Sequence, residues 1–481
     1  MPLILPGNVG SATAVTGFNV ANSVRMDAAS SSKMAIDFSG AGNQKKFTIS
    51  CWVKRATITP SASQTILSNY ADVNNFCNFT LNTSDKLSFV NRDGGTFNTN
   101  VATTRLFRDP SAFYHVVLSV DTGQGTDTNR IKMYVNGVQE TSFSTATYPD
   151  QDTDLKFNTT ATTNFGSWSG SAQYADGYYS ELCFINDAQL AADQFGEFDS
   201  DSGIWKPIDV SGLTFGTNGF YLDFEDSANL GNDANGGTDL TETNLAATDQ
   251  STDTCTNNFA TLNPLDLYHN ATANTQSTSS EGNLYYTVAS GNKGFARSTF
   301  GVSAGKWYFE VEANSVGKGF YGVCNAGIME DGTALQPSAV YYYEAVPDFR
   351  SGDQIITTNA VSVSAGSILG FALDMDNHAL YISKDGTYMN SGDPTSGSSR
   401  TGAISELFTT GRAILSDFGE VFANVANTST TGGLDAKVNF GSPFYSESGG
   451  NSDGNGHGNF KTAPPSGYLA FCTKNLAKTG G

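Results

Sequence analysis

The chain has 481 residues, enough for roughly two or three domains that each bury a hydrophobic core. Gly, Phe and Tyr are abundant, charged residues make up only 15%, and sustained helical periodicity is missing, which is typical of a turn-rich, all-β protein. The formal charge of −21 would repel a phosphate backbone, so we expect no nucleic-acid partner.

Residues 1–22 are predicted to form an extended N-terminal arm. They are mostly small or polar and contain Pro2, Pro6 and Gly7. We expect this arm to dock onto a partner, with a frayed terminus as the alternative. It has no basic region before a long apolar run, so we do not expect a signal peptide. No segment of the chain approaches roughly 18 uninterrupted apolar residues, so we expect no membrane insertion.

Residues 23–195 are predicted to form a first β-sandwich. The runs 47–55, 114–121, 130–139 and 174–190 alternate apolar and polar residues with period two, which marks half-buried strands. Asn136 and Gly137 lie between two predicted strands of a hairpin, 132–135 and 139–143, and both tolerate positive φ, as a type I′ turn requires. The best helix candidate, residues 188–198, is one short piece.

The rest of the chain divides into three predicted parts. Residues 196–265 form a polar, Gly-rich connector with one strong strand predicted at 219–224. It is too aromatic to be a passive linker, and we expect it to be ordered and to pack across both domains. Residues 266–445 form a second β-domain, with strands expected in 305–313, 318–327 and 366–388. Residues 446–481 form a C-terminal tail that begins flexible in composition and then becomes strand-like at 468–472.

Two family resemblances follow from these segments. The strands FTISCWVKR, YHVVLSVD, RIKMYVNGVQ and YADGYYSELCFINDAQL resemble, in this order, the laminin-G/pentraxin-like branch of the concanavalin A-like lectins. GKWYFEVEA and GSILGFALDMDNHALYISKDGTY resemble the SPRY domain. Both families are built as concanavalin A-like sandwiches. The expected fold class is therefore all-β, with two jelly-roll sandwiches in series, an ordered connector and an extended N-terminal arm.

A third resemblance covers nearly the whole chain. The join FGEFDSDSGIWKPIDVSGLTFGTNGFYLDF, the element TNNFATLNPL and the opening MPLILPGNVGSATA resemble uncharacterised bacteriophage proteins of the marine cyanophage and pelagiphage type. The resemblance implies a virion protein that is assembled in the host cytoplasm and released by lysis. By analogy it also implies a homo-oligomer, with a trimer favoured, bound to other virion proteins through the N-terminal arm.

The sequence favours a protein without catalytic activity. Glycosidases on this fold use closely spaced acids on one strand. The nearest match, Glu197 to Asp201, lacks the third acid, and Glu310 and Glu312 are predicted to be a solvated strand face. His115 lies within a core strand, where packing is favoured over catalysis. The six cysteines show no zinc-binding spacing, and we expect buried free thiols.

No cofactor is expected to be required, but calcium is worth weighing, because laminin-G and pentraxin-like domains often bind it on rim loops. Candidate oxygen ligands occur in two turns: Asp233, Asn235 and Asp239 in the first, Asp374 and Asp376 in the second. Asx and Gly residues cluster in any β-turn, so the sequence favours turns over metal sites.

Glycan binding would need an exposed aromatic ring flanked by hydrogen-bonding groups, because the apolar face of a sugar stacks on a ring. Trp168 lies among small polar residues, which favours exposure, and Tyr174 follows it. The run Tyr341, Tyr342 and Tyr343, with Glu344, is the second candidate, since a strand must point alternate rings outward. Packing is the alternative for each residue.

These observations lead to one main hypothesis and two alternatives. The main hypothesis is a tail-fibre or appendage adhesin that binds a host surface glycan or receptor through the loops of its sandwiches. The first alternative is a capsid decoration or head-fibre protein with a structural role. The disfavoured alternative is a tail glycan depolymerase.

Overall fold

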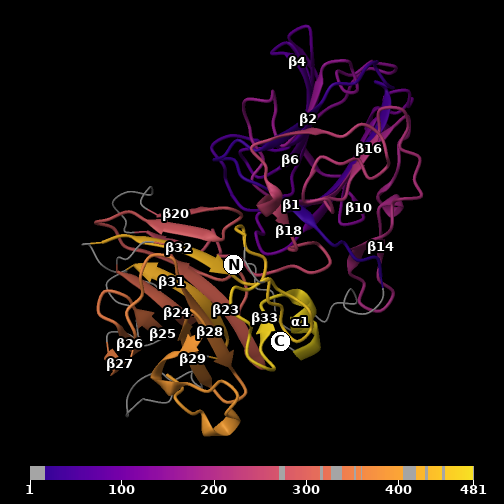
Figure 1. The fold of residues 1–481 in the computed structure, drawn as a ribbon. Coiled ribbons are helices and arrows are strands. Elements are labelled where there is room, and N and C mark those ends of the chain that lie inside the picture. The colour runs from indigo at the N-terminus through magenta and orange to yellow at the C-terminus, as the bar shows by residue number, and fades with distance from the viewer. Residues whose placement is uncertain are drawn as a thin grey trace. The chain divides into compact units, whose positions relative to one another are not determined.

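A computed structural model describes residues 17–269, 277–314, 318–326, 339–351, 354–358, 360–404, 419–427, 432–446 and 450–479. The chain divides into two compact units (Figure 1). Of the described residues, those up to 257 form what we call the N-terminal unit, and those from 258 onwards form the C-terminal unit. Most of the predicted arm, residues 1–16, lies outside the described residues.

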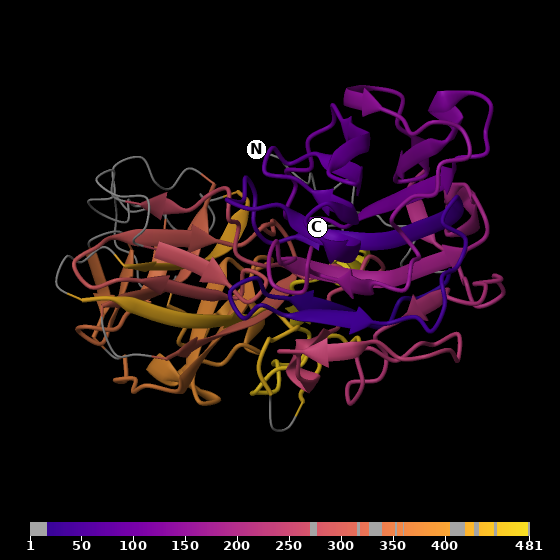
Figure 2. The same cartoon turned by 90° about the horizontal axis from the view of Figure 1, so that it is seen from above.

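Both units consist of β-sheets whose strands pair almost entirely antiparallel, which confirms the predicted all-β fold class (Figures 1 and 2). The described residues include a single α-helix, α1 (Thr473–Thr479), beside short 3-10 turns. None of the helices in this part of the chain has the length and apolar character needed to span a membrane.

The N-terminal unit contains two eight-stranded sheets. Sheet A has the order β10 (Val138–Gln139), β9 (Ile131–Val135), β8 (Tyr114–Asp121), β3 (Lys46–Arg55), β13 (Gly177–Asn186), β1 (Ser23–Met26) and β18 (Gln250–Ser251), with β16 (Phe220–Leu222) also paired to β13. Sheet B has the order β11 (Phe143–Thr147), β7 (Thr96–Thr103), β6 (Leu87–Asp93), β5 (Asn75–Leu81), β4 (Gln64–Asp72), β12 (Thr162–Phe165), β2 (Lys33–Ile36) and β17 (Thr241–Thr243).

Strand β5 shows how side chains divide between the two faces of sheet B. Cys77, Phe79 and Leu81 join the buried core between the sheets, together with residues of sheet A such as Phe47 and Val116. Side chains alternate along a strand, so Phe76, Asn78 and Thr80 take the outer face. The inner face is filled by apolar packing, so only side chains on the outer face of this sheet can contact a ligand.

The outer face of sheet A is covered by the chain itself. Ala192, Phe195, Val210 and Phe215 pack there against side chains of β8, β9 and β13. The alternation of β3 and β13 predicted half-buried strands. Because of this cover, both strands are instead buried along nearly their whole lengths. The predicted helix at 188–198 is wrong, because a 3-10 turn at Ala192–Gln194 and strand β14 (Gly196–Phe198) stand there.

The segment expected to be a connector adds structure to the N-terminal unit. Strand β14 pairs with β15 (Trp205–Pro207), while β16, β17 and β18 extend sheets A and B. Residues 196–257 thus belong to the first compact unit rather than standing between two domains.

The predicted hairpin at residues 131–139 is present. Asn136 (φ 47°) and Gly137 (φ 80°) both have the positive φ of a type I′ turn between β9 and β10. After Gln139 the chain leaves sheet A and enters β11 of sheet B. The region after the turn therefore forms two short strands in different sheets rather than one hairpin strand.

The C-terminal unit is a second sandwich. Sheet C has the order β19 (Tyr268–His269), β22 (Gly294–Arg297), β31 (Val421–Asn427), β24 (Gly319–Asn325), β25 (Ala339–Tyr343), β26 (Asp348–Ser351) and β27 (Gln354–Thr357). Sheet D has the order β20 (Ser277–Ser280), β21 (Tyr285–Val288), β32 (Leu434–Asn439), β23 (Lys306–Ala313), β28 (Ser367–Asp374), β29 (Ala379–Lys384) and β30 (Thr387–Tyr388), and β33 (Leu469–Ala470) pairs in parallel with β23.

The C-terminal tail packs on the outer face of sheet D. Phe460, Tyr468 and Cys472 form a buried cluster with Tyr308 and Tyr381. Glu310, fully buried in β23, accepts hydrogen bonds from the backbone N–H groups of 461 and 462 and so holds the tail in place. The expectation that Glu310 is solvated is wrong, because the tail encloses it.

A buried ion pair ties the two sheets of the N-terminal unit together. Arg55, at the end of β3, donates from Nη1 to Oδ1 of Asp85 (2.9 Å), in the turn between β5 and β6, and both side chains are fully buried. Asp85 also accepts the backbone N–H of Thr59 and Nε of Arg108. The same guanidinium donates to the carbonyl oxygen of Phe107 and to Gln64. This network positions the β5–β6 hairpin of sheet B.

We predict that Asp85→Asn lowers the free energy of unfolding of the N-terminal unit by about 3–5 kcal/mol, because it leaves the Arg55 charge buried without its partner. Asn tolerates the left-handed backbone of this position (φ 59°). Urea unfolding measures the change. Asp93→Asn is the control, since the exposed Asp93–Lys156 pair should contribute less than about 1 kcal/mol. Equal effects of both variants would contradict the prediction.

Candidate functional site

The outer face of sheet B carries a row of large side chains that crosses neighbouring strands. Tyr70 of β4 stands opposite Phe76 of β5, Phe76 opposite Arg92 of β6, and Arg92 opposite Phe97 of β7. Directly paired residues lie on the same side of a sheet. Since Phe76 faces away from the core, all four residues of the row do so.

The aromatic rings of this row meet a fourth ring from a loop. Trp168, which follows β12, packs edge-to-face on Tyr70 (centroids 5.0 Å apart) and on Phe76 (5.2 Å). Phe76 packs edge-to-face on Phe97 at 6.1 Å. We call Tyr70, Phe76, Phe97 and Trp168 the aromatic platform. Phe76 is buried beneath the others, Tyr70 and Trp168 are half-buried, and Phe97 is 50% exposed.

Hydrogen-bonding groups border the aromatic platform. The Arg92 guanidinium lies 5.1 Å from the Phe97 ring centre, and its Nε and Nη1 donate to the carbonyl oxygens of Gly95 and Val73. Asn78, two residues from Phe76 on the same face, is buried, and its Oδ1 accepts no hydrogen bond.

The loop between β12 and β13 is what places Trp168. The N–H of Trp168 donates to the carbonyl oxygen of Ala172, and Ser68 of β4 donates through its hydroxyl to the carbonyl oxygen of Trp168. Trp168, predicted as an exposed ring, thus lies at the platform. Tyr174 lies in the same loop, half-buried, and its hydroxyl reaches the carbonyl oxygen of Gly170 at 3.5 Å.

The second predicted aromatic site is corrected by the structure. Tyr342 is fully buried in the core of the C-terminal unit, and Tyr341 is 1% exposed in an aromatic cluster on the outer face of sheet C. Glu344 is also buried and accepts the N–H of Gly319. Only Tyr343 is half-buried, with its ring stacked on Phe320 at 4.6 Å. Packing therefore accounts for this run.

The oxygens of the first predicted calcium site close turns. Asp233 is buried and accepts the backbone N–H groups of Tyr221, Asn235 and Gly237. Asp239 accepts the N–H of Asp233, and Asn235 is exposed.

The second predicted calcium turn is similar. Asp374 pairs with Lys306 at 3.0 Å and accepts from Asn377, while Asp376 accepts the N–H of Gly305. In the part of the chain that the structure describes, no group of three or more His, Cys, Asp or Glu side chains is arranged to hold a metal ion.

Ser50 and His115 are in contact, as the nucleophile and base of a catalytic pair would be, but the ring proton of His115 is on the nitrogen that faces Ser50. Nε2 of His115 lies 2.8 Å from Oγ of Ser50, and Nδ1 accepts the indole N–H of Trp205 at 3.0 Å. Because Nδ1 is an acceptor, the neutral ring carries its proton on Nε2 and donates to Ser50, so it cannot take the proton of Ser50. Burial lowers the pKa of His115 to about 3, and both residues are buried. The contact is structural.

Two buried carboxyl groups are likewise bonded into the fold. Glu181 accepts the hydroxyl of Tyr221 at 2.6 Å, and burial raises the pKa of Glu181 to about 8. Burial also raises the pKa of Glu310, which holds the tail as described above. Their raised pKa values reflect enclosure by the protein and not a cleft that holds a substrate.

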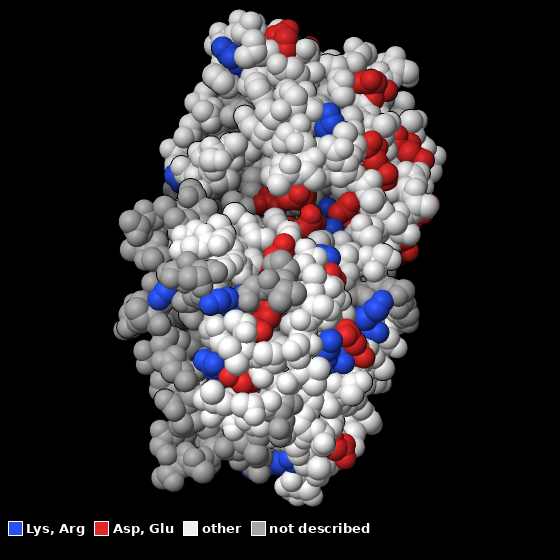
Figure 3. Space-filling view, turned by 60° about the vertical axis from the view of Figure 1, so that its left-hand side comes forward, with Lys and Arg blue, Asp and Glu red and all other residues white. Residues whose placement is uncertain are grey.

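The charged surface agrees with the acidic composition. On the face drawn in Figure 3, Asp and Glu side chains stand in small groups on a surface made mostly of other residues. Among the described residues of that face, Lys and Arg form no extended basic patch. A phosphate backbone would find no continuous track of positive charge there.

Comparison with known proteins relates part of the chain to a family. Residues 28–193 match the model of the concanavalin A-like lectin/glucanases superfamily. This match confirms the predicted relation of the first sandwich to concanavalin A-like lectins. No curated protein sequence matches the chain.

Several solved structures are similar to parts of the chain. The SPRY domain of human HERC1 is 17% identical, with 37% of this chain and 96% of that one covered and a TM-score of 0.26. A heptameric SAP-like pentraxin from Limulus polyphemus is 14% identical, with 37% and 82% covered and a TM-score of 0.27. Domain 4 of AbnA, an arabinanase from Geobacillus stearothermophilus solved with arabinotriose, is 22% identical, with 31% and 64% covered and a TM-score of 0.24. Likenesses of this size assign no ligand to the chain.

We predict that His115 makes the protein less stable in acid. Its folded pKa of about 3 lies below the unfolded value of roughly 6.5, so acidification protonates the unfolded chain first. The free energy of unfolding should therefore fall from about pH 6.5 downwards, by about 2 kcal/mol at pH 5 for this group. Urea unfolding of the wild type and of His115→Gln at about pH 7.5 and about pH 5 isolates the contribution. Identical pH dependence of the two proteins would contradict it.

Proposed function

We propose that this protein is a non-enzymatic adhesin that binds a surface glycan at the aromatic platform of sheet B. The observation that carries the proposal is the exposed ring of Phe97, continued by Trp168 and Tyr70 over the buried ring of Phe76. Large exposed apolar groups that are fixed by packing and rimmed by polar groups mark binding surfaces.

The chemistry of the platform suits a sugar better than an apolar ligand. A pyranose ring offers an apolar face to stack on aromatic rings and hydroxyl groups around its edge. Arg92 can donate to those hydroxyls from Nη2. Val73, 53% exposed at the neighbouring hairpin tip, extends the apolar surface. No cofactor is needed for this mode of binding.

The biological setting of the proposal comes from the resemblance to phage virion proteins. In this setting the adhesin belongs to a tail fibre or similar appendage, is assembled in the host cytoplasm and leaves the cell by lysis. Its N-terminal arm anchors it to other virion proteins, and the copies form a homo-oligomer, with a trimer favoured by analogy.

We predict that Phe97→Ala and Trp168→Ala each weaken binding of host surface polysaccharide about tenfold or more, because stacking of a sugar on a ring is lost. Isothermal titration with purified polysaccharide measures the affinity. Phe198→Ala is the matched control, since Phe198 is 53% exposed on the separate β14–β15 hairpin. Loss of binding in the control, or full binding by both platform variants, would contradict the proposal.

We also predict that immunogold label against the N-terminal unit gathers on the tail appendages of purified particles, because an adhesin must stand where the particle meets the host. Electron microscopy gives the position of the label directly. Label spread over the head would favour the decoration role instead, and failure to label any particle would contradict a virion location.

A further inference from the structure

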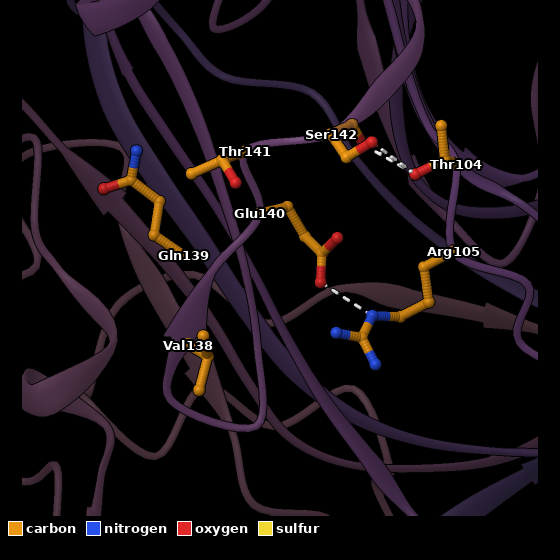
Figure 4. Close-up of a pocket in the computed structure, with 7 residues that line it drawn as sticks. All are labelled: Thr104, Arg105, Val138, Gln139, Glu140, Thr141 and Ser142. Carbon is orange, nitrogen blue, oxygen red and sulfur yellow. Dashed lines mark hydrogen bonds and ion pairs between the residues drawn. The ribbon is translucent and has the colours of Figure 1, made fainter.

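A hollow of about 540 Å³ lies where the chain passes from sheet A to sheet B. It is lined by Thr104, Arg105, Val138, Gln139, Glu140, Thr141 and Ser142 (Figure 4). The first two residues follow β7 of sheet B, and the others include β10 and the link to β11. This volume falls within the range of roughly 300–1,000 Å³ that is typical of small-molecule sites.

Arg105 is the one charged donor among the residues that line this hollow, and Glu140 orients its side chain. Its Nε donates to Oε1 of Glu140 at 2.7 Å (Figure 4). The Glu140 side chain is 7% exposed, whereas the Arg105 side chain is 50% exposed. Among the described residues, neither terminal nitrogen of Arg105 has a hydrogen-bond partner. A buried carboxylate thus orients a guanidinium whose two terminal N–H groups are open to a ligand.

The rest of the lining offers neutral polar groups. The hydroxyl of Thr104 donates to the hydroxyl of Ser142 at 2.9 Å, and Gln139 and Thr141 are exposed. A planar guanidinium with two open donors matches a carboxylate. Hydroxyl and amide side chains match the hydroxyl groups of a sugar. We infer that the hollow binds a carboxylate-bearing sugar, such as a uronic acid residue.

Two other arginines of the same unit show what is particular to Arg105. Arg108 is oriented in the same way, by Nε on the buried Asp85 with its side chain 49% exposed, but it does not line the hollow. In Arg130, each of the three guanidinium nitrogens donates a hydrogen bond to a backbone carbonyl oxygen: Nε to Gln124, Nη1 to Pro149 and Nη2 to Gly125. That guanidinium braces a loop with all three of its nitrogens, whereas the Arg105 side chain uses only Nε among the described residues. The hollow shares no lining residue with the aromatic platform, so this inference does not rest on the proposed function.

Isothermal titration of the full chain with glucuronic acid, its methyl ester and glucose tests the inference. We expect glucuronate to bind and the ester and glucose to bind about tenfold more weakly or not at all. Arg105→Gln should weaken glucuronate binding about tenfold or more, while Lys132→Gln, a charge loss on β9 outside the hollow, should leave it unchanged. Should Arg105→Gln fail to fold, Arg105→Lys keeps a cation beside Glu140 but loses the planar fork, and binding should still weaken.

Three results would overturn the inference. The first is equal binding of glucose and glucuronate, and the second is unchanged glucuronate binding by the folded Arg105 variant. The third is loss of glucuronate binding in Phe97→Ala, which would place the acid at the aromatic platform and leave the proposed function standing. Conversely, if Phe97→Ala loses polysaccharide binding but keeps glucuronate binding, the two sites are separate, as inferred.

Discussion

The two-residue alternation of strand β5 is the constraint on which the candidate site depends. Cys77, Phe79 and Leu81 must face the core, so Phe76 and Asn78 must face outward. A slip of one residue would exchange the two sets, and the apolar core forbids it. The Arg55–Asp85 pair adds a second restraint, because it fixes the turn that follows β5. The register of sheet B therefore decides which rings a ligand can meet.

The sheets differ in what their outer faces carry. Residues 192–215 supply an apolar cover to sheet A, and the C-terminal tail covers sheet D around Tyr308 and Phe460. On sheet B, the loop that carries Trp168 packs at one end, and Phe97 keeps half of its surface exposed. The segments that the sequence predicts to be a connector and a tail are thus structural parts of the sandwiches. They direct any binding role towards the faces and edges that they leave open.

Much of the fold could be predicted from the sequence, but only part of the site. Strand β8 coincides with its predicted residues 114–121, because alternation over eight residues is a strong local signal. In the connector, β16 lies within the strand predicted at 219–224. Strands β17 and β18 were missed, since they have only two or three residues each, within polar, Gly-rich surroundings. Small polar neighbours predicted an exposed Trp168, but its ring is half-buried, because it packs on Tyr70 and Phe76. Phe97 could not be paired with Phe76 without the cross-strand register, and the burial of Tyr341 depends on an aromatic cluster contributed by distant strands.

The most direct test follows the indole N–H signals of the four tryptophans by NMR while host surface polysaccharide is added. Trp168 lies at the aromatic platform, Trp52 and Trp307 are buried, and Trp205 donates its N–H to His115. The account predicts that the Trp168 signal shifts with the polysaccharide concentration while the other three stay in place. A shift of the Trp205 signal alone, or no shift of any signal when the polysaccharide is bound, would contradict binding at sheet B.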